Sequence, residues 1–266
     1  MRVLSTRSLR SLRKVLLGLA GLAGFLVVWQ SIPTMGLINS QYLPYATDVF
    51  GRLFEELRDL AFWRRLGFTM TSWAIGLGVA TFAAVVLGTI VGLVPFLRRA
   101  THTMVEFLRP IPSVALIPLA VLMFGIQMQA ALVIIIYASF WQVFVQVIYG
   151  VADVDAVARD TARSFGLTRR EHLWYLVLPT ALPYLMTGVR LAAAVALILA
   201  ITSEMVIGNP GLGRMIELSR SAGDAVGLYA LVMVTGLLGL LVNLVFRFVE
   251  RRSLSWHQSV RGEEVL

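Results

Sequence analysis

The run from Phe68 to Phe96 contains 29 residues without a single Asp, Glu, Lys or Arg, and it is rich in Gly and Ala. A helix needs about 20 apolar residues to cross the bilayer core, which is roughly 30 Å thick. A soluble domain could not hide this run within a chain that is 58% hydrophobic and only 14% charged. Because the long runs lack the alternation of a membrane β-barrel, we predict an all-α polytopic membrane protein in the lipid bilayer.

Five further apolar stretches bring the expected number of transmembrane helices to about six. They lie at 15–32, 109–127, 130–150, 181–206 and 228–248. The predicted layout is a basic cytoplasmic N-terminus at 1–14, a first transmembrane helix at 15–32, an external amphipathic segment at 33–65, a core domain with five transmembrane helices at 66–250 and a cytoplasmic tail at 251–266. Cleavage of the first stretch as a signal peptide is disfavoured, because no clear small-x-small site follows it.

The segment 33–65 has apolar residues at helical spacing among charges of both signs. Val49, Leu53, Leu57 and Leu60 fall on one face of a helix. We expect this helix to lie on the outer membrane surface.

Three prolines interrupt the third predicted span. Pro110, Pro112 and Pro118 each lack a backbone donor and bend or delay a helix. Because freed carbonyls in lipid need protein or water partners, the span either lines a cavity or contains a packing kink. The polar residues at 98–109 before it are predicted to form an inner loop.

The cations set the predicted orientation. With six spans, sixteen of the 23 Lys and Arg residues lie on the side of both termini, six lie on the other side, and Arg190 falls within a span. The positive-inside rule then places both termini and the segment 153–179 on the cytoplasmic side of the membrane.

Several classes of function are excluded. The chain has no cysteine, and His102, His172 and His257 are scattered without carboxylates at ligand spacing, so no metal or other cofactor is expected. There is no Walker A, GxSxG or HExxH pattern, so the chain is not expected to be an enzyme. The net charge of +8 sits at the ends of apolar runs, which argues against nucleic acid as a partner.

The segment 153–179 is a polar island with its own local signals. A short helix is predicted from Val154 to Phe165, with Asp153 or Asp155 near its N-terminus. Gly166 can end this helix in a left-handed conformation. Thr168 and Glu171 form a capping-box pattern for a second helix, which Pro179 is predicted to stop.

The same island resembles the EAA loop of ABC importer permeases. The family pattern is EAA, three residues, Gly, nine residues, then I-x-L-P. Gly166, Leu178 and Pro179 match it outright, Ala162 matches its second Ala, and Asp160, Thr161 and Leu176 stand for Glu, Ala and Ile. Four further features resemble nitrate, sulfonate and taurine permeases: LPYATDVFGRLFEEL at 43–57, PIPSVALIPLAVLMFGI at 110–126, LPTALPYLMTGVRLA at 178–192, and Glu204 followed by GLG at 211–213.

This resemblance implies a multi-pass permease subunit of an ABC importer in the bacterial inner membrane, with the fold of that class. It implies a homodimer that binds two copies of a separate cytoplasmic ATPase through 153–179 and receives cargo from an extracytoplasmic solute-binding protein. The implied cargo is a small anion such as a sulfonate, taurine or nitrate. ATP hydrolysis would belong to the partner subunit.

Three residues are candidates for the translocation path or its gate: Pro118, Arg190 and Glu204. Arg190 would be an intramembrane cation, which is a functional candidate by default. It could instead reach the lipid headgroups or pair within the helix bundle. Glu204 could steady the GLG loop or a gate, or be solvated at the interface.

Two other classes of function remain open from the residues. A secondary transporter or channel would need intramembrane acids or an inverted repeat, and neither is apparent. A non-transporting membrane scaffold is disfavoured by the proline-broken span and the polar island.

Overall fold

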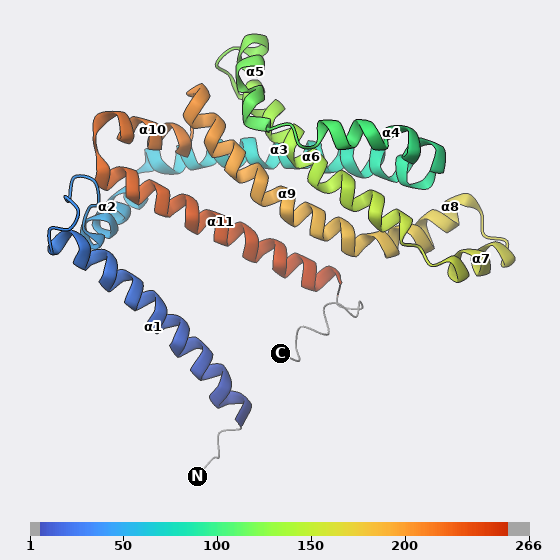
Figure 1. Ribbon diagram of the computed structural model, residues 1–266, viewed down its shortest axis with the longest axis horizontal. Helices are drawn as coiled ribbons and strands as arrows, with labels where there is room; N and C mark the ends of the chain where they lie inside the picture. The colour runs from blue at the N-terminus through green and yellow to red at the C-terminus, as the bar shows by residue number, and fades with distance from the viewer. Residues whose placement is uncertain (1–5, 255–266) are drawn as a thin grey trace. The chain divides into compact units, whose positions relative to one another are not determined.

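The computed structural model describes residues 6–254, and every regular element in this range is a helix. The elements are α1 (Thr6–Thr34), α2 (Ala46–Arg58), α3 (Leu60–Leu93), α4 (Pro95–Leu108), η1 (Ser113–Leu116), α5 (Ile117–Phe124), α6 (Met128–Ala152), α7 (Ala156–Ser164), α8 (Arg169–His172), η2 (Leu173–Val177), α9 (Leu178–Ile207), α10 (Leu212–Ala222) and α11 (Ala225–Ser253) (Figure 1). Parts of the predicted N-terminal segment 1–14 and tail 251–266, His257 among them, lie outside the described residues.

Five of these helices are long and apolar enough to cross a membrane. They are residues 16–34 of α1, then α3, α6, α11, and the continuous helix from Arg169 to Ile207 that contains α9. A sixth span exists if α4 and the η1–α5 segment form one broken crossing. The predicted all-α membrane architecture is confirmed.

The third predicted span is not a continuous helix. The stretch 98–109, predicted as an inner loop, is helical, because α4 occupies Pro95–Leu108; the proline of α4 lies in the first turn, where a missing N–H costs nothing. The chain then bends by 81° before η1 and α5. Pro110 and Pro112 lie in this break, whereas Pro118 lies in the first turn of α5.

The chain forms two compact units. One contains residues up to Phe62 together with Ile216–Val234, and the other contains Trp63–Met215 together with residues from Thr235 onward. Each unit therefore groups segments that are far apart in the chain. α10 and α11 each contribute residues to both units. The predicted domain boundaries remain predictions.

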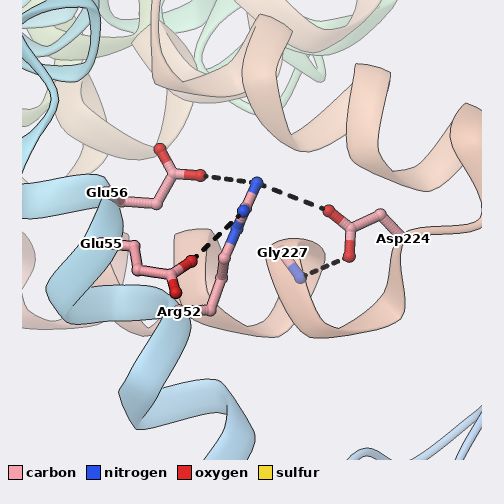
Figure 2. Close-up of polar contacts among 5 residues, drawn as sticks. All are labelled: Arg52, Glu55, Glu56, Asp224 and Gly227. Atoms are coloured by element: carbon pink, nitrogen blue, oxygen red, sulfur yellow. Dashed lines mark hydrogen bonds and ion pairs between the residues drawn. The ribbon is translucent and has the colours of Figure 1, made fainter.

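Arg52 links two distant segments of the first unit, as Figure 2 shows. Its guanidinium lies 3.5 Å from Glu55 and 3.2 Å from Glu56 in the same helix, and 3.8 Å from Asp224 before α11. Asp224 also accepts a 2.9 Å hydrogen bond from the Gly227 amide in the first turn of α11. A cation of α2 thus contacts the carboxylate at a helix start that follows it by about 170 residues in the chain.

The predicted apolar face of the external segment is only partly correct. Val49 and Leu53 are buried in α2, as expected for its amphipathic face. However, α2 ends at Arg58, Asp59 is extended, and Leu60 begins α3 with 65% of its side chain exposed. Because the helix breaks at Asp59, Leu60 does not share the apolar face of α2 with Val49 and Leu53.

The core of the second unit depends on small residues between helices. A Cβ atom at Gly150 of α6 would lie 2.9 Å from the Ala181 Cα of α9, and one at Gly188 of α9 would lie 3.2 Å from the Val143 Cα of α6. Gly88 and Gly92 of α3 fit in the same way against Val147 and Val151 of α6. Because lipid supplies no hydrophobic drive for helix association, close approach at small residues provides the packing energy.

Candidate functional site

The segment 153–179 forms a helix, a turn and a second helix, as predicted. Asp155 is the N-cap of α7, where its side chain accepts a 2.8 Å hydrogen bond from the Ala158 amide. After α7, Gly166 has a φ of +72°, and the Leu167 amide donates to the Ala162 carbonyl at 3.1 Å. This pattern satisfies the last carbonyls of the helix and needs a residue that tolerates the left-handed region.

The second helix starts at the predicted capping box. The Thr168 hydroxyl accepts from the Glu171 amide, and the Glu171 carboxylate accepts from the Thr168 amide at 2.8 Å. The turn between α7 and α8 is therefore held at both ends by local hydrogen bonds.

The prediction that Pro179 stops this helix is wrong. α8 continues through η2, a five-residue π-helical turn, into α9, and the helical path from Arg169 to Ile207 is unbroken. Pro179 lies in the first turn of α9, directly after the π turn. A π turn shifts the hydrogen-bond ladder by one residue, which lets a helix continue past a residue without an N–H.

The residues of the EAA-like motif lie in two environments. Ala162 is buried, and Leu176, Leu178 and Pro179 are half-buried. Asp160, Thr161 and Gly166 are exposed. The motif therefore both anchors the loop on the bundle and forms part of its outer surface.

Sequence reasoning missed the aromatic side chains on that outer surface. Phe165 is 80% exposed, Tyr175 is 76% exposed and Trp174 is 59% exposed. Large apolar groups on a polar loop mark an interaction surface when they lie together. A search for aromatics within the predicted island would have found them.

One hydrogen bond ties the start of the loop to the bundle. The Tyr184 hydroxyl of α9 donates to the Asp153 carboxylate at 2.7 Å. The start of the 153–179 segment is thus joined to α9 by a side-chain hydrogen bond.

Glu204 lies at the centre of a second, buried polar site. Its carboxylate oxygen Oε2 accepts from the Thr69 hydroxyl of α3 at 2.9 Å and from the Gly213 amide at 3.0 Å. The Leu212 amide donates to the Thr69 hydroxyl at 2.9 Å. Leu212 and Gly213 begin α10, so α3 and α9 together cap the free amides of that helix.

The GLG sequence is required sterically at this site. A Cβ at Gly211 would overlap the Glu204 carboxylate, and a Cβ at Gly213 would overlap the Ile201 carbonyl oxygen. Glu204 is only 1% exposed, so it is not solvated at an interface. Of the alternatives for Glu204, steadying the GLG loop fits this geometry.

Arg190 pairs within the helix bundle. Its Nη1 lies 3.0 Å from the Glu250 carboxylate of α11, with 33% of the Arg190 side chain and 17% of the Glu250 side chain exposed. Sequence analysis missed Glu250, because α11 extends past the expected end of the last span at 248. Arg190 and Glu204 are separated by roughly 21 Å along the axis of α9, at 1.5 Å per residue, so they do not form one site.

The comparisons with known proteins agree with this architecture. Residues 84–255 match the family model described as "Binding-protein-dependent transport system inner membrane component". The taurine transport system permease protein TauC of Escherichia coli (strain K12) is 30% identical over 244 residues, which cover 89% of this chain and 88% of that protein. The putative aliphatic sulfonates transport permease protein SsuC of the same strain is 27% identical over 241 residues, covering 91% and 92%.

A solved structure shares the fold. A chain of a bacterial ABC transporter involved in the import of the acidic polysaccharide alginate aligns with a TM-score of 0.64 at 15% identity, over 92% of this chain and 99% of that one. The family model covers more than half of the chain, and its description names an inner-membrane component. The chain therefore belongs to the family of binding-protein-dependent transport system inner membrane components, and it is the multi-pass permease subunit of an ABC importer.

Proposed function

We propose that this permease carries a small sulfonate-like anion and that its ATPase docks on the segment 153–179. The cargo proposal is supported by the names of the two relatives, which transport taurine and aliphatic sulfonates. Nitrate, also a small oxyanion, belongs to the same proposal.

The docking proposal rests on one observation: the segment 153–179 has three exposed aromatic side chains, Phe165 directly after α7 and Trp174 and Tyr175 in η2. Aromatic side chains are the usual anchors of protein interfaces. In this proposal Ala162, Leu176, Leu178 and Pro179 hold the loop on the bundle. Asp160, Thr161 and Gly166 shape the surface that enters the ATPase.

The proposed assembly contains two copies of this chain, two ATPase subunits and an extracytoplasmic solute-binding protein. Both termini and the 153–179 segment would be cytoplasmic. The first helix at 15–32 would act as an anchor, the segment 33–65 would be external, and 66–250 would be the core permease domain. Closure of the ATPase dimer would move the two loops together and switch access to the path.

We also propose roles for the three path candidates. The bend before α5 and its first-turn Pro118 would allow a non-helical stretch to line the path between the two copies. The Arg190–Glu250 pair would hold α9 against α11 and break during opening. Glu204 would keep the GLG loop and the start of α10 fixed at one end of α9.

Docking is tested by copurification of the tagged ATPase with permease variants. Phe165→Asp places a charge on the proposed interface without a buried contact to lose, so we expect a strong loss of ATPase in the pull-down. Tyr42→Ala is the control, because Tyr42 is a 73% exposed aromatic in the predicted external segment. Unchanged ATPase recovery with Phe165→Asp would refute docking at this surface.

Orientation is tested by single cysteines, since the natural chain has none. A membrane-impermeant maleimide should label Asn39→Cys in intact cells and label Arg169→Cys only after lysis. The reverse pattern would overturn the proposed topology. Both positions are exposed, so access within the protein does not limit labelling.

Cargo is tested with the transporter reconstituted in proteoliposomes with its own ATPase and binding protein. We expect ATP-dependent uptake of labelled taurine, and we expect unlabelled ethanesulfonate or nitrate to reduce this uptake by competition. Uptake of none of these anions would exclude the proposed cargo class, whereas uptake without ATP would contradict the proposed drive.

A further inference from the structure

The second unit contains a basic cavity that neither the docking loop nor the proposed path accounts for. Its volume is about 750 Å³, and it lies where the ends of α3, α4 and α6 meet α7 and α8. Four arginines and two histidines line it, and no Asp or Glu does: Arg98, Arg99, His102, Arg159, Arg163 and His172. We refer to this space as the basic cavity.

The carboxylates of the 153–171 stretch and Glu106 all have partners, and two of them pair with cations that line the basic cavity. In the 153–171 stretch, Asp153 accepts from Tyr184, Asp155 caps α7, and Glu171 belongs to the capping box. Asp160 lies 3.6 Å from Arg163, with both side chains exposed. Glu106 lies 3.4 Å from His102.

Four of the six basic residues have no such carboxylate. Among residues 6–254, Arg98, Arg99, Arg159 and His172 form no ion pair. The Nε atom of Arg159 and the Nε2 atom of His172 are buried and have no hydrogen-bond partner within the same range. The chain therefore supplies no acceptor for these two nitrogens, and no carboxylate in the wall of the cavity neutralises its cations.

The wall of the basic cavity also has an apolar side. Leu93, Val151 and Val177 line it beside the cations. The carbonyl ends of α3 and α6 border the same space and offset part of the positive charge. A ligand that satisfies both sides has an anionic head and a short hydrocarbon part.

We infer that the basic cavity binds an organic oxyanion, with a phosphate or sulfonate head held by Arg159 and His172 and supported by Arg98. Guanidinium groups bind tetrahedral oxyanions through paired N–H donors. An imidazole N–H adds a further donor. The anion can come from a phospholipid headgroup or from a small solute, since both carry the same chemistry.

The inference does not depend on the cargo or on the direction of transport. It concerns binding to the full-length permease, which can be measured without the ATPase. Its failure would leave the proposed docking and transport unaffected.

The test uses two probes on the purified full-length permease. One arm titrates ethanesulfonate into permease held in phosphatidylcholine nanodiscs and measures binding by calorimetry. The other arm measures by native mass spectrometry how much phosphatidylglycerol, relative to phosphatidylcholine, stays bound in detergent. The two arms separate a small solute from a lipid headgroup.

The variants remove the proposed ligands one group at a time. The double variant Arg159→Gln, His172→Gln should weaken binding of the active probe by about tenfold or more, which is the effect of losing roughly 1.4 kcal/mol. Arg98→Gln should weaken it by a smaller factor. Arg169→Gln is the matched control, because Arg169 is an exposed cation of α8 that does not line the basic cavity. The affinity of this variant for the probe should stay within about twofold of wild type.

Saturable binding of either probe that depends on Arg159 and His172 supports the inference and identifies the source of the anion. Absence of saturable binding of both probes to wild type would overturn it. Equal weakening by Arg169→Gln would also overturn it, because that result means general charge attraction. If the double variant does not fold, Arg98→Gln tests the inference, and unchanged binding by this variant would then overturn it. Arg98 forms no ion pair within residues 6–254, so its replacement should leave the fold intact.

Discussion

The carboxylate of Glu204 accepts a 2.9 Å hydrogen bond from the hydroxyl of Thr69, although 135 residues separate the two in the chain. Both side chains are fully buried, and together they cap the first amides of α10. This arrangement joins α3, α9 and the GLG loop at one point. It explains why a carboxylate is buried near the end of this span.

Removing this carboxylate should destabilise the permease. Glu204→Ala leaves the Thr69 hydroxyl and the Gly213 amide buried without an acceptor, so we expect a loss of about 1–3 kcal/mol in the free energy of unfolding. Glu204→Gln keeps an accepting oxygen and should lose less. Thermal denaturation in detergent measures both. Glu106→Ala is the control, because that side chain is 69% exposed, and an equal loss there would contradict the prediction.

The contact between α6 and α9 should tolerate no added methyl group at Gly150. Gly150→Ala puts a Cβ 2.9 Å from the Ala181 Cα and the Tyr184 Cβ, so the helices must separate. We expect a loss of about 1–3 kcal/mol from overpacking. Gly78→Ala serves as the control, since a Cβ there meets nothing within 4 Å. Equal melting temperatures for the two variants would show that the helices do not pack so closely.

The Arg190–Glu250 pair should behave as a coupled unit. Arg190→Gln or Glu250→Gln alone leaves a partly buried charge without its partner, so each should destabilise the protein. The double variant should recover part of the loss, with a coupling energy of about 0.5–3 kcal/mol. A double-mutant cycle of thermal unfolding measures this coupling. Additive effects would mean that the two charges do not interact in solution.

Gly166 should matter for coupling more than for folding. Gly166→Ala forces an L side chain into the left-handed region at a cost of roughly 1–2 kcal/mol, while its Cβ meets no neighbour. We expect the turn to distort and ATPase-driven uptake to fall. Gly36→Ala carries the same strain at a φ of +73° in the predicted external segment, so its uptake should stay near wild type. Equal uptake by the two variants would remove Gly166 from the coupling surface.

Local signals predicted the structure of the 153–179 segment well. The N-cap at Asp155, the left-handed Gly166 and the Thr168–Glu171 box each depend on contacts within a few residues, and such contacts can be read from spacing. Pro179 misled the same reasoning. The rule that proline stops a helix assumes α-helical hydrogen bonding, and the π turn at Leu173–Val177 changes that ladder.

The sequence by itself determined the membrane-spanning helical class, because uncharged runs of sufficient length have no other stable arrangement in lipid. It also determined the helix–turn–helix of the 153–179 segment and the family resemblance that this segment carries. Only the tertiary structure decided that Thr69 meets Glu204, that Arg190 meets Glu250, and that six basic residues from α4, α7 and α8 surround one cavity. These contacts depend on which faces of distant helices pack together. Small residues such as Gly150 and Gly188 permit that packing, but their spacing alone does not name the partner helix.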